Sequence, residues 1–224
     1  SPEVDAKMVQ WKSRLGSTAE LLGVGIERLD YTKGIPQRLR AVDYLLEQHP
    51  ELRKRFVYVQ IAAPSRSHIP EYQKVEDEID NLVHQINFRW QVGGWRPVVY
   101  LKEHHGPTDM MALHRLARFC MVSSLHDGMN LVAKEFVASR ADNDGVLILS
   151  QFTGSARELH DALLVNPFAV HELAEAMYQA VLMSPEERSR RMQRMREHVE
   201  RNNVYRWGGK LLSDLLKFDF PENT

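Results

Sequence analysis

The 224-residue sequence predicts an α/β domain built on a Rossmann-like, doubly wound parallel sheet of about six strands. Two observations carry this prediction. Short runs rich in β-branched and aromatic residues alternate with longer segments of helical periodicity, which is typical of βαβ units. Residues 146–149 (Val-Leu-Ile-Leu) are continuously apolar, as expected of a strand that is buried on both faces.

The first half contains three predicted strands, at residues 21–26, 56–61 and 98–101. Between the first two, Gly34 and Pro36 open a helix, since proline suits the first helical turn. Its apolar residues recur at helical spacing: Ile35, Leu39, Val42, Leu45 and Leu46. The helix after the second strand has its own apolar face: Val75, Ile79, Leu82 and Ile86.

The second half continues the alternation. Thr108 is predicted to cap the helix after the third strand. The elements expected after it are a strand at 119–122, a helix at 130–139, the strand at 146–149, a short helix near 156–159 and a last strand at 162–165. The remaining segments are expected to be helical: 170–183, a helix that restarts at Ser184-Pro185, and a leucine-rich helix around Trp207.

Bulk properties exclude several classes of protein. The net charge of −1 gives no reason to expect a nucleic acid or an anionic membrane as partner. No apolar run approaches the ~18 residues of a membrane-spanning helix. The single cysteine, Cys120, cannot form an internal disulfide, so we expect a cytoplasmic protein. His104, His105 and His114 lack a familiar ligand spacing, so neither a metal nor another cofactor is predicted.

The chain begins Ser1-Pro2-Glu3, without an initiator methionine, and we expect it to be a piece of a longer protein. Three parts are predicted: a linker or helix at 1–20, the Rossmann-like domain at 21–202 and a C-terminal helix at 203–224. In doubly wound sheets, ligands bind beyond the carboxyl ends of the strands. The turns that follow the strands are therefore where function is expected.

The turn after the first strand carries two cations. Arg28 and Lys33, five positions apart, suit a diphosphate, with the guanidinium as a fork donor and the ammonium as a point charge. The structural alternative is a solvated loop in which Arg28 pairs with Asp30. Arg66, after the second strand, adds a third cation at the same edge or is a surface arginine. A dinucleotide fingerprint at Gly23-Val24-Gly25 is weak because its third glycine is missing.

The turn after the fourth strand is the most informative. It leads through Asp127-Gly128 into a helix, whose free N–H groups and dipole attract phosphate, and Gly128 permits close approach of a ligand. Asp127 and Glu135 lie just over two helical turns apart and could hold sugar and ribose hydroxyls. The alternatives are an Asx turn or helix cap for Asp127 and a surface ion pair for Glu135. The small polar turn at 150–156 could line the same pocket.

Taken together, residues 28–34, Arg66 and residues 126–135 resemble the donor-site motifs of the trehalose-6-phosphate synthase family. Residues 146–152, 165–167 and 203–207 are similar to later segments of that family, so the resemblance runs from about Leu22 to Leu216. It implies that the chain is the C-terminal, donor-binding half of a retaining glycosyltransferase of the two-domain GT-B architecture.

The resemblance also implies roles for individual residues. Arg28, Lys33 and Asp127 would be catalytic. The donor would be held as follows: the diphosphate by Arg28, Lys33 and the backbone of Asn130 and Leu131, the ribose by Glu135, the glucose by Asp127 with Gly128 and Met129 nearby, and the uracil near His105 and Met110. Arg66 would reach the phosphate of the acceptor.

The implied reaction is transfer of glucose from a nucleotide sugar, typically UDP-glucose, to glucose-6-phosphate. The charge of the leaving diphosphate would be met by Arg28, Lys33 and helix N–H groups rather than by a metal. An N-terminal Rossmann-like domain would be the protein partner, and this chain alone would bind nucleotide with little transferase activity. Glucosylglycerol-phosphate synthases, pseudo-glycosyltransferases, a stand-alone nucleotide-sugar-binding module and a scaffold domain are the alternatives.

Overall fold

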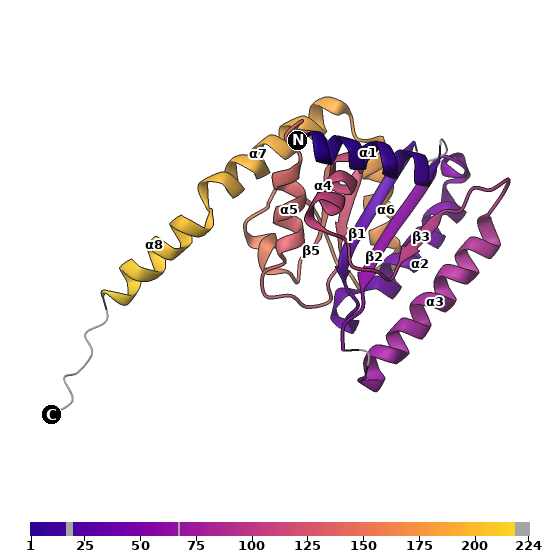
Figure 1. Ribbon diagram of the computed structural model, residues 1–224, viewed down its shortest axis with the longest axis horizontal. Helices are drawn as coiled ribbons and strands as arrows, with labels where there is room; N and C mark the ends of the chain where they lie inside the picture. Colours follow the sequence, from indigo (N-terminus) through magenta and orange to yellow (C-terminus); the bar gives the residue numbers. More distant parts are fainter. Residues whose placement is uncertain (17–19, 67, 218–224) are drawn as a thin grey trace.

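The computed structural model describes residues 1–16, 20–66 and 68–217. At its centre lies a six-stranded sheet in the order β3-β2-β1-β4-β5-β6, in which every neighbouring pair is parallel (Figure 1). The strands are β1 (Leu21–Arg28), β2 (Phe56–Ala63), β3 (Val98–Leu101), β4 (Phe119–Val122), β5 (Val146–Ser150) and β6 (Leu163–Val165). The predicted fold class is therefore confirmed.

Helices cover both faces of this sheet, as two sets that pack among themselves. One set is α2 (Ile35–Gln48), α3 (Pro70–Trp90) and α6 (Val170–Leu182). The other set is α1 (Pro2–Leu15), α4 (Pro107–Leu116), α5 (Leu131–Ser139) and α7 (Pro185–Arg201). Short 3₁₀ turns complete the domain: η1 (Tyr31–Lys33), η2 (Pro50–Leu52) and η3 (Gly154–Arg157).

The strand order reverses between β1 and β4. From β1 the chain moves outward to β2 and β3, then returns to place β4 on the other side of β1, where Val24 lies opposite Cys120. Parallel sheets bind ligands in the crevice at the carboxyl ends of the two strands where the order reverses. The loops that follow β1 and β4 are thus brought together at this position.

The glycines of β1 allow close packing inside the sheet. A Cβ on Gly23 would lie 2.4 Å from Cζ of Phe119, and one on Gly25 would lie 2.1 Å from Nη1 of Arg38. Real side chains do not approach so closely, so both positions require glycine. This confirms the interpretation of Gly23 and Gly25 as strand residues rather than as part of a dinucleotide fingerprint.

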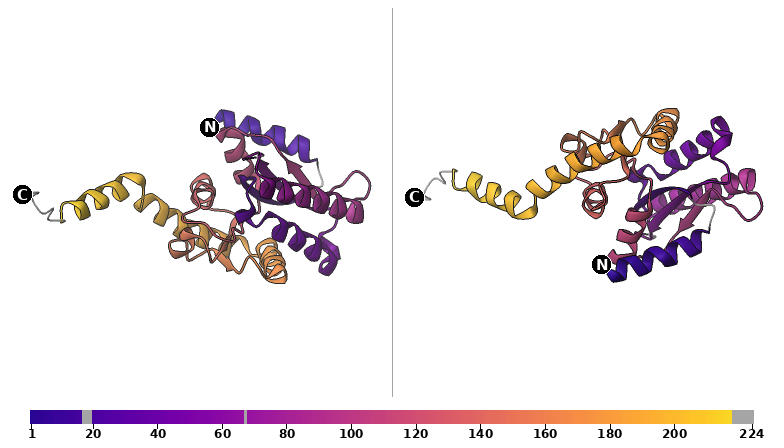
Figure 2. Two further views of the ribbon diagram at one scale, coloured as in Figure 1. Left: turned by 90° about the horizontal axis from the view of Figure 1, so that it is seen from below. Right: turned by 90° about the horizontal axis from the view of Figure 1, so that it is seen from above.

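The two ends of the chain differ in how they attach to the domain. Val4 and Trp11 of α1 are both only 4% exposed, and α1 packs along α4. By contrast, α8 (Val204–Leu215) projects away from the sheet and contains no buried residue (Figure 2). Residues 17–19 of the expected N-terminal segment and 218–224 of the expected C-terminal segment lie outside the described residues.

Two local predictions were wrong. Gly106, not Thr108, is the N-cap of α4, because Pro107 already fits the first helical position. The short helix expected near 156–159 is instead the 3₁₀ turn η3, which begins at Gly154. Its amides bond three residues back, as in Ala156 N–H to the Thr153 carbonyl at 3.1 Å. No helix among the described residues is long and apolar enough to cross a membrane.

Candidate functional site

The loop after β1 is ordered by Asp30, which caps η1. Its carboxylate accepts hydrogen bonds from the Thr32 backbone N–H at 2.8 Å, the Thr32 hydroxyl at 2.7 Å and the Tyr72 hydroxyl at 3.1 Å. Burial is the largest influence on the pKa of Asp30 and raises it, but the bonds from Thr32 and Tyr72 outweigh burial and leave the pKa lowered. Arg28 does not pair with Asp30, so that structural alternative is wrong. Its exposed side chain has no hydrogen bond or ion pair with any described residue.

The loop after β1 lies directly against the loop after β4. Gly34 adopts a left-handed backbone with φ of 65°, and a Cβ there would lie 2.2 Å from the Ser123 carbonyl oxygen. The Leu125 backbone N–H donates to the Thr32 carbonyl at 2.7 Å. A residue with a side chain at position 34 would push the two loops apart. Gly34 therefore permits the contact that brings Lys33 to the second loop.

Lys33 and Asp127 form an ion pair across the two loops. Lys33 Nζ lies 2.7 Å from Asp127 Oδ2, and the two side chains are 17% and 16% exposed. Asp127 also accepts from Asn130 Nδ2 at 3.1 Å and from the Met129 N–H at 3.4 Å. Burial is the largest influence on the pKa of Asp127 and raises it, yet the hydrogen bonds from Lys33 and Asn130 outweigh it and leave the pKa lowered. Asp127 thus supports its own turn and also faces Lys33.

The N-terminus of α5 follows immediately. Asn130 has a φ of 68° and caps the helix, since its Oδ1 accepts from the Ala133 N–H at 3.0 Å. Met129 and Leu131 on either side of it are 48% and 58% exposed, and nothing lies within 4 Å of the Cβ that Gly128 would gain. A positive φ at a non-glycine residue costs about 1–2 kcal/mol. The protein therefore holds Asn130 in a strained conformation that leaves this helix end open.

Glu135 lies on the same helix as the cap, five residues or about one and a half turns further along. Its side chain is exposed and makes no ion pair with any residue in the described part of the chain. The neighbouring Lys134 instead pairs with Glu158 at 2.9 Å. The alternative of a surface ion pair for Glu135 is therefore wrong, and its carboxylate is available to a ligand.

The loop after β5 joins the loops after β1 and β4 in forming the candidate site. The Gly154 N–H donates to the Asp127 carbonyl at 3.0 Å, and the Ser155 hydroxyl donates to the Asn130 carbonyl at 2.9 Å. A Cβ on Gly154 would lie 2.0 Å from the Gly128 carbonyl oxygen. The turn at 150–156 therefore packs against the Asp127–Asn130 turn, as its sequence position suggested.

The other three predicted site residues stand apart from this cluster. Arg66 follows β2 at the same sheet edge, is exposed and has a φ of 49°, a second strained non-glycine residue. His105, in the loop after β3, packs against Trp11 with ring centroids 5.5 Å apart, and its side chain is only 9% exposed. Met110 of α4 is partly buried against the core. Among the described residues, no hydrogen bond joins these three to the cluster around Lys33.

Sequence reasoning missed a polar network beneath the two loops. Arg38 is fully buried and donates from Nη1 to Glu27 at 2.9 Å, from Nη1 to Gln60 at 2.9 Å and from Nε to the Ser123 hydroxyl at 3.0 Å. A signal was present at Gln60, which interrupts the apolar run of the second strand, and at Glu27, which ends that of the first, whereas Arg38 lies among other polar residues of its helix. Charged side chains are almost never fully buried without a partner, so such interruptions indicate partners.

The histidines do not form a metal site. Within residues 1–16, 20–66 and 68–217, no group of three or more His, Cys, Asp or Glu side chains is placed to hold a metal ion. His114 is 2% exposed and meets the Phe136 ring edge-on, with centroids 5.5 Å apart. Burial, assisted by the charge of Arg140, lowers the pKa of His114 to about 4, so it is a neutral core residue at neutral pH.

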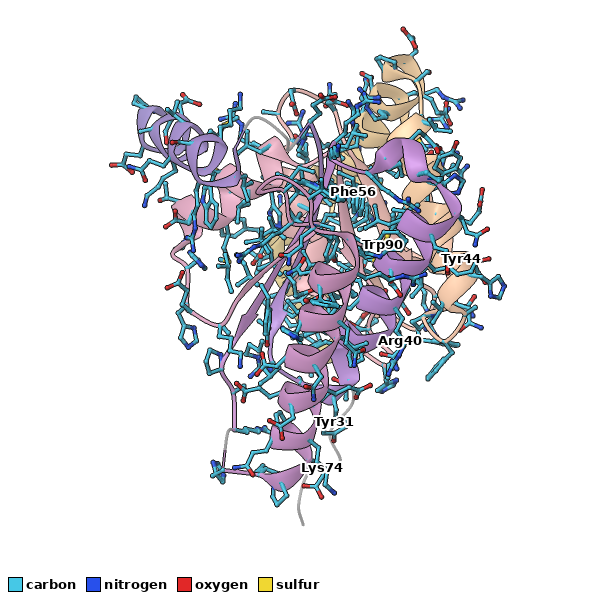
Figure 3. All side chains as sticks on the ribbon, turned by 90° about the vertical axis from the view of Figure 1, so that its right-hand side faces the viewer. Tyr31, Arg40, Tyr44, Phe56, Lys74 and Trp90 are labelled. Carbon is cyan, nitrogen blue, oxygen red and sulfur yellow. The ribbon has the colours of Figure 1, made fainter. Side chains whose placement is uncertain are left out.

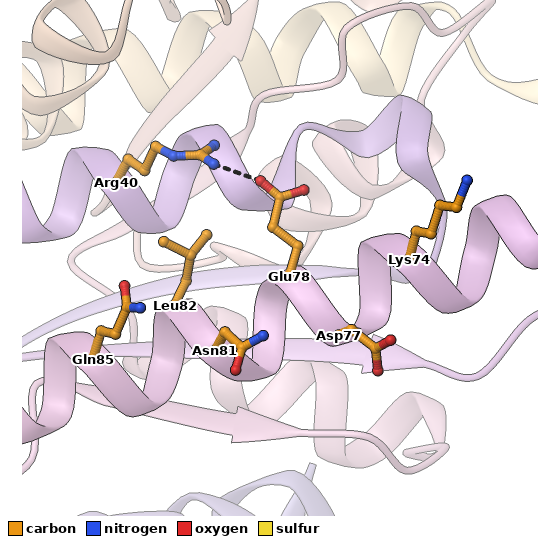
Figure 4. A pocket seen from close by; sticks show the side chains of 7 residues that line it. All are labelled: Arg40, Lys74, Asp77, Glu78, Asn81, Leu82 and Gln85. Carbon is orange, nitrogen blue, oxygen red and sulfur yellow. Dashed lines mark hydrogen bonds and ion pairs between the residues drawn. The ribbon is translucent and has the colours of Figure 1, made fainter.

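A surface groove between α2 and α3 is separate from the site. Figure 4 shows its lining side chains: Arg40, Lys74, Asp77, Glu78, Asn81, Leu82 and Gln85. Arg40 is paired with Glu78 at 2.5 Å, and none of the lining residues is a candidate from the sequence. In Figure 3, Tyr31 of η1 and Lys74 lie at one end of the molecule, opposite Phe56 at the start of β2. The groove thus supplies cations that serve as controls for the site.

A doubly wound sheet whose reversal point carries two cations, an acidic side chain and an exposed helix N-terminus is the arrangement at which α/β domains commonly bind phosphorylated ligands. Residues 1–217 match the profile of glycosyltransferase family 20. The chain belongs to that family, as the motifs at Arg28, Lys33 and Asp127 suggested.

The similar proteins are trehalose-phosphate synthases. The chain is 37% identical over 215 residues to the UDP-forming α,α-trehalose-phosphate synthase of Pichia angusta, covering 96% of this chain and 45% of that protein. It matches the E. coli trehalose-6-phosphate structure bound with UDP-2-fluoro glucose at a TM-score of 0.91 and 38% identity, over 96% of this chain and 47% of that one. A Burkholderia xenovorans synthase in complex with glucose-6-phosphate gives a TM-score of 0.91 and 35% identity, over 96% and 48%. The chain spans less than half the length of the curated relatives it matches.

Proposed function

We propose that this chain is the donor-binding half of a retaining glycosyltransferase that transfers glucose from UDP-glucose to glucose-6-phosphate. The supporting observation is the Lys33–Asp127 ion pair at 2.7 Å at the N-terminus of α5, with Arg28 at the end of β1 making no ion pair among the described residues. One of the similar structures is bound with UDP-2-fluoro glucose and another is in complex with glucose-6-phosphate, which agrees with this substrate pair.

In this proposal the donor lies across the Lys33–Asp127 pair. The diphosphate takes Lys33 away from Asp127 and also binds Arg28, because each phosphate oxygen accepts charge-assisted hydrogen bonds. The N–H groups at the start of α5, next to Asn130 and Leu131, face the same anion. Asp127 then turns to the hydroxyls of the glucose, with Gly128 and Met129 beside it. Glu135, which is exposed and without an ion pair among the described residues, accepts from the ribose hydroxyls.

The chemistry follows from this charge arrangement. The bond between glucose C1 and the diphosphate oxygen breaks while a hydroxyl of the acceptor forms a new bond to C1 on the same face. The proton of that hydroxyl passes to the departing phosphate. Arg28, Lys33 and the N–H groups of α5 stabilise the negative charge that develops on the leaving group, and they are in place before the reaction begins. Asp127, held on its turn by Asn130, fixes the position of the sugar.

The acceptor is proposed to approach from a second Rossmann-like domain. Arg66 would bind the acceptor phosphate, and His105 with Met110 would border the uracil. The boundaries proposed for this chain remain 1–20, 21–202 and 203–224. Helix α8 supports the two-domain proposal because its large apolar side chains are all exposed: Val204, Tyr205, Trp207, Leu211, Leu212, Leu215 and Leu216. Such a face is expected to pack against the other domain. We place the enzyme in the cytoplasm, since its single cysteine favours a reducing compartment.

The test is calorimetric titration of the chain with UDP, UDP-glucose, GDP-glucose and ADP-glucose. UDP is expected to bind, and Lys33→Ala is expected to weaken it by about 1.5–3 kcal/mol, or roughly 10- to 150-fold, because a charge-assisted hydrogen bond is lost. Lys74→Ala is the matched control, since it removes a lysine from the surface groove. Equal losses in both variants, or none in Lys33→Ala, would refute the phosphate assignment.

The proposed ribose contact has its own test. Glu135→Gln keeps the size of the side chain but removes its charge, and it is expected to weaken UDP binding by about tenfold. The same change at Glu3, an exposed acid in the first turn of α1 that has no ion pair among the described residues, is the control. Binding of 2′-deoxy-UDP should be affected less by Glu135→Gln than binding of UDP, because one of the two hydroxyl partners is already missing.

A further inference from the structure

The polar network under the loops has features that stability alone does not explain. The Arg38 side chain is 0% exposed and that of Glu27 is 1% exposed, so a complete ion pair is held out of water. Taking two charges out of water costs several kcal/mol for each ion, and replacing such a pair by apolar residues is often neutral or stabilising. Gln60 completes the set, as its Nε2 donates to Glu27 at 2.9 Å and to the Gly25 carbonyl at 3.2 Å.

The network is connected to the site by two backbone carbonyls and by one neighbour in the chain. Nη2 of Arg38 lies 3.4 Å from the Lys33 carbonyl oxygen. The Ser123 hydroxyl accepts from Nε of Arg38 at 3.0 Å and donates to the Gly34 carbonyl at 3.1 Å. Glu27 is the residue before Arg28 in the chain. Lys33 therefore stands on backbone that this buried set holds, and Arg28 directly follows a member of the set.

We propose that Arg38, Glu27 and Ser123 form a positioning set that fixes the loops after β1 and β4 before any ligand binds. None of the three reaches the ligand. They hold the Lys33 and Gly34 carbonyls, so that the Lys33 ammonium points at the anion site and less freedom is lost when the diphosphate arrives. The identity of that ligand rests on the proposed function, whereas the fixing of the loops does not.

Ser123 offers the sharpest test because one atom carries both connections. Ser123→Ala removes the hydroxyl that bridges Arg38 and Gly34 and leaves every proposed ligand contact intact. The matched control is Ser139→Ala, since Ser139 is also buried but bonds only the Phe136 carbonyl of its own helix. We expect Ser123→Ala to weaken UDP binding about three- to tenfold and Ser139→Ala to leave it unchanged.

A double-mutant cycle separates positioning from general damage to the fold. If Ser123 acts through Lys33, the effect of Ser123→Ala on UDP binding should disappear in the Lys33→Ala background. An undiminished effect in that background overturns the proposal. So does equal binding by the Ser123→Ala and Ser139→Ala variants.

Hydrogen exchange on the ligand-free wild-type chain supplies a readout that needs neither a variant nor a nucleotide. The Leu125 N–H, bonded to the Thr32 carbonyl, and the Lys33 N–H, bonded to the Asp30 carbonyl, should exchange as slowly as core amides. Fast local exchange of both amides overturns the proposal. Slow exchange in a chain that binds no nucleotide would uphold the fixed loops while refuting the proposed function.

Discussion

Replacing Gly34 by alanine is expected to be one of the most damaging single-methyl changes in this domain. The residue has a φ of 65°, and a left-handed conformation costs an L-residue about 1–2 kcal/mol. The added Cβ would also lie 2.2 Å from the Ser123 carbonyl oxygen, and overpacking of this kind costs about 1–3 kcal/mol. Since the neighbour is backbone, it cannot swing away. The expected loss is therefore about 2–5 kcal/mol in the free energy of unfolding.

Gly93→Ala is the matched control for this prediction. Its φ is 57°, yet nothing lies within 4 Å of the Cβ that it would gain. Only the cost of the left-handed backbone conformation applies, so urea unfolding should show a loss of about 1–2 kcal/mol in the free energy of unfolding. The change in unfolded-state entropy is common to both variants and cancels in the comparison. If both variants lose the same stability, the proposed contact between the loops after β1 and β4 is wrong.

Three further outcomes follow from burial and charge. Trp11→Ala should lower the free energy of unfolding in urea by about 3–5 kcal/mol, because the Trp11 side chain is 4% exposed. Trp207 is 60% exposed, so Trp207→Ala should change that free energy by no more than about 0.5 kcal/mol. The pKa of His114 is lowered to about 4, so its contribution to stability is complete above the unfolded value of 6.5 and is lost as pH falls toward 4. Thermal unfolding of the wild-type chain should show that the free energy of unfolding falls by up to about 3 kcal/mol between pH 6.5 and pH 4. If a His114→Gln variant loses stability equally steeply with pH, the loss does not come from His114. Asp127→Asn should strengthen UDP binding several-fold, because the carboxylate competes with the diphosphate for Lys33. The same change should reduce the advantage of UDP-glucose over UDP, because the proposed contact of Asp127 with the glucose hydroxyls is weakened. Weaker binding of both ligands in calorimetry would argue against this competition.

The fold was largely predictable because each strand is an apolar run between helices of clear periodicity. The run at 146–149 became the buried strand β5, and Gly34-Ile35-Pro36 became the start of α2. Helix starts were less predictable. Thr108 competes with Pro107 for the start of α4, and the choice depends on where the preceding loop leaves the chain. The direction of α8 could not be predicted either, since none of its residues is buried against this domain.

The exposed residues of the site were predictable from the sequence, but the buried residues that hold them in place were not. Lys33 and Asp127 were expected to bind different parts of one ligand, and the structure pairs them directly. That pairing depends on the reversal of strand order between β1 and β4, which no local pattern encodes. Arg38 was hidden for a similar reason. It occupies a polar position on a helix whose apolar stripe is otherwise regular, and its partners come from two different strands and a loop.

Several costly features of this domain lie at one edge of the sheet, while the positive φ values of Lys54 and Asn143 and the buried Arg140 and Arg188 lie elsewhere. The strained φ values of Arg66 and Asn130 and the buried charge of Arg38 all lie at or beneath the carboxyl ends of β1, β2 and β4. Strain and buried charge persist where the surrounding structure over-determines them, and they concentrate at binding and catalytic sites. Arg28 and Glu135, which lack ion-pair partners throughout the described residues, lie at the same edge. Under the proposed function these features belong together: they form the anion site for the donor, and the exposed apolar face of α8 packs against the domain that delivers the acceptor.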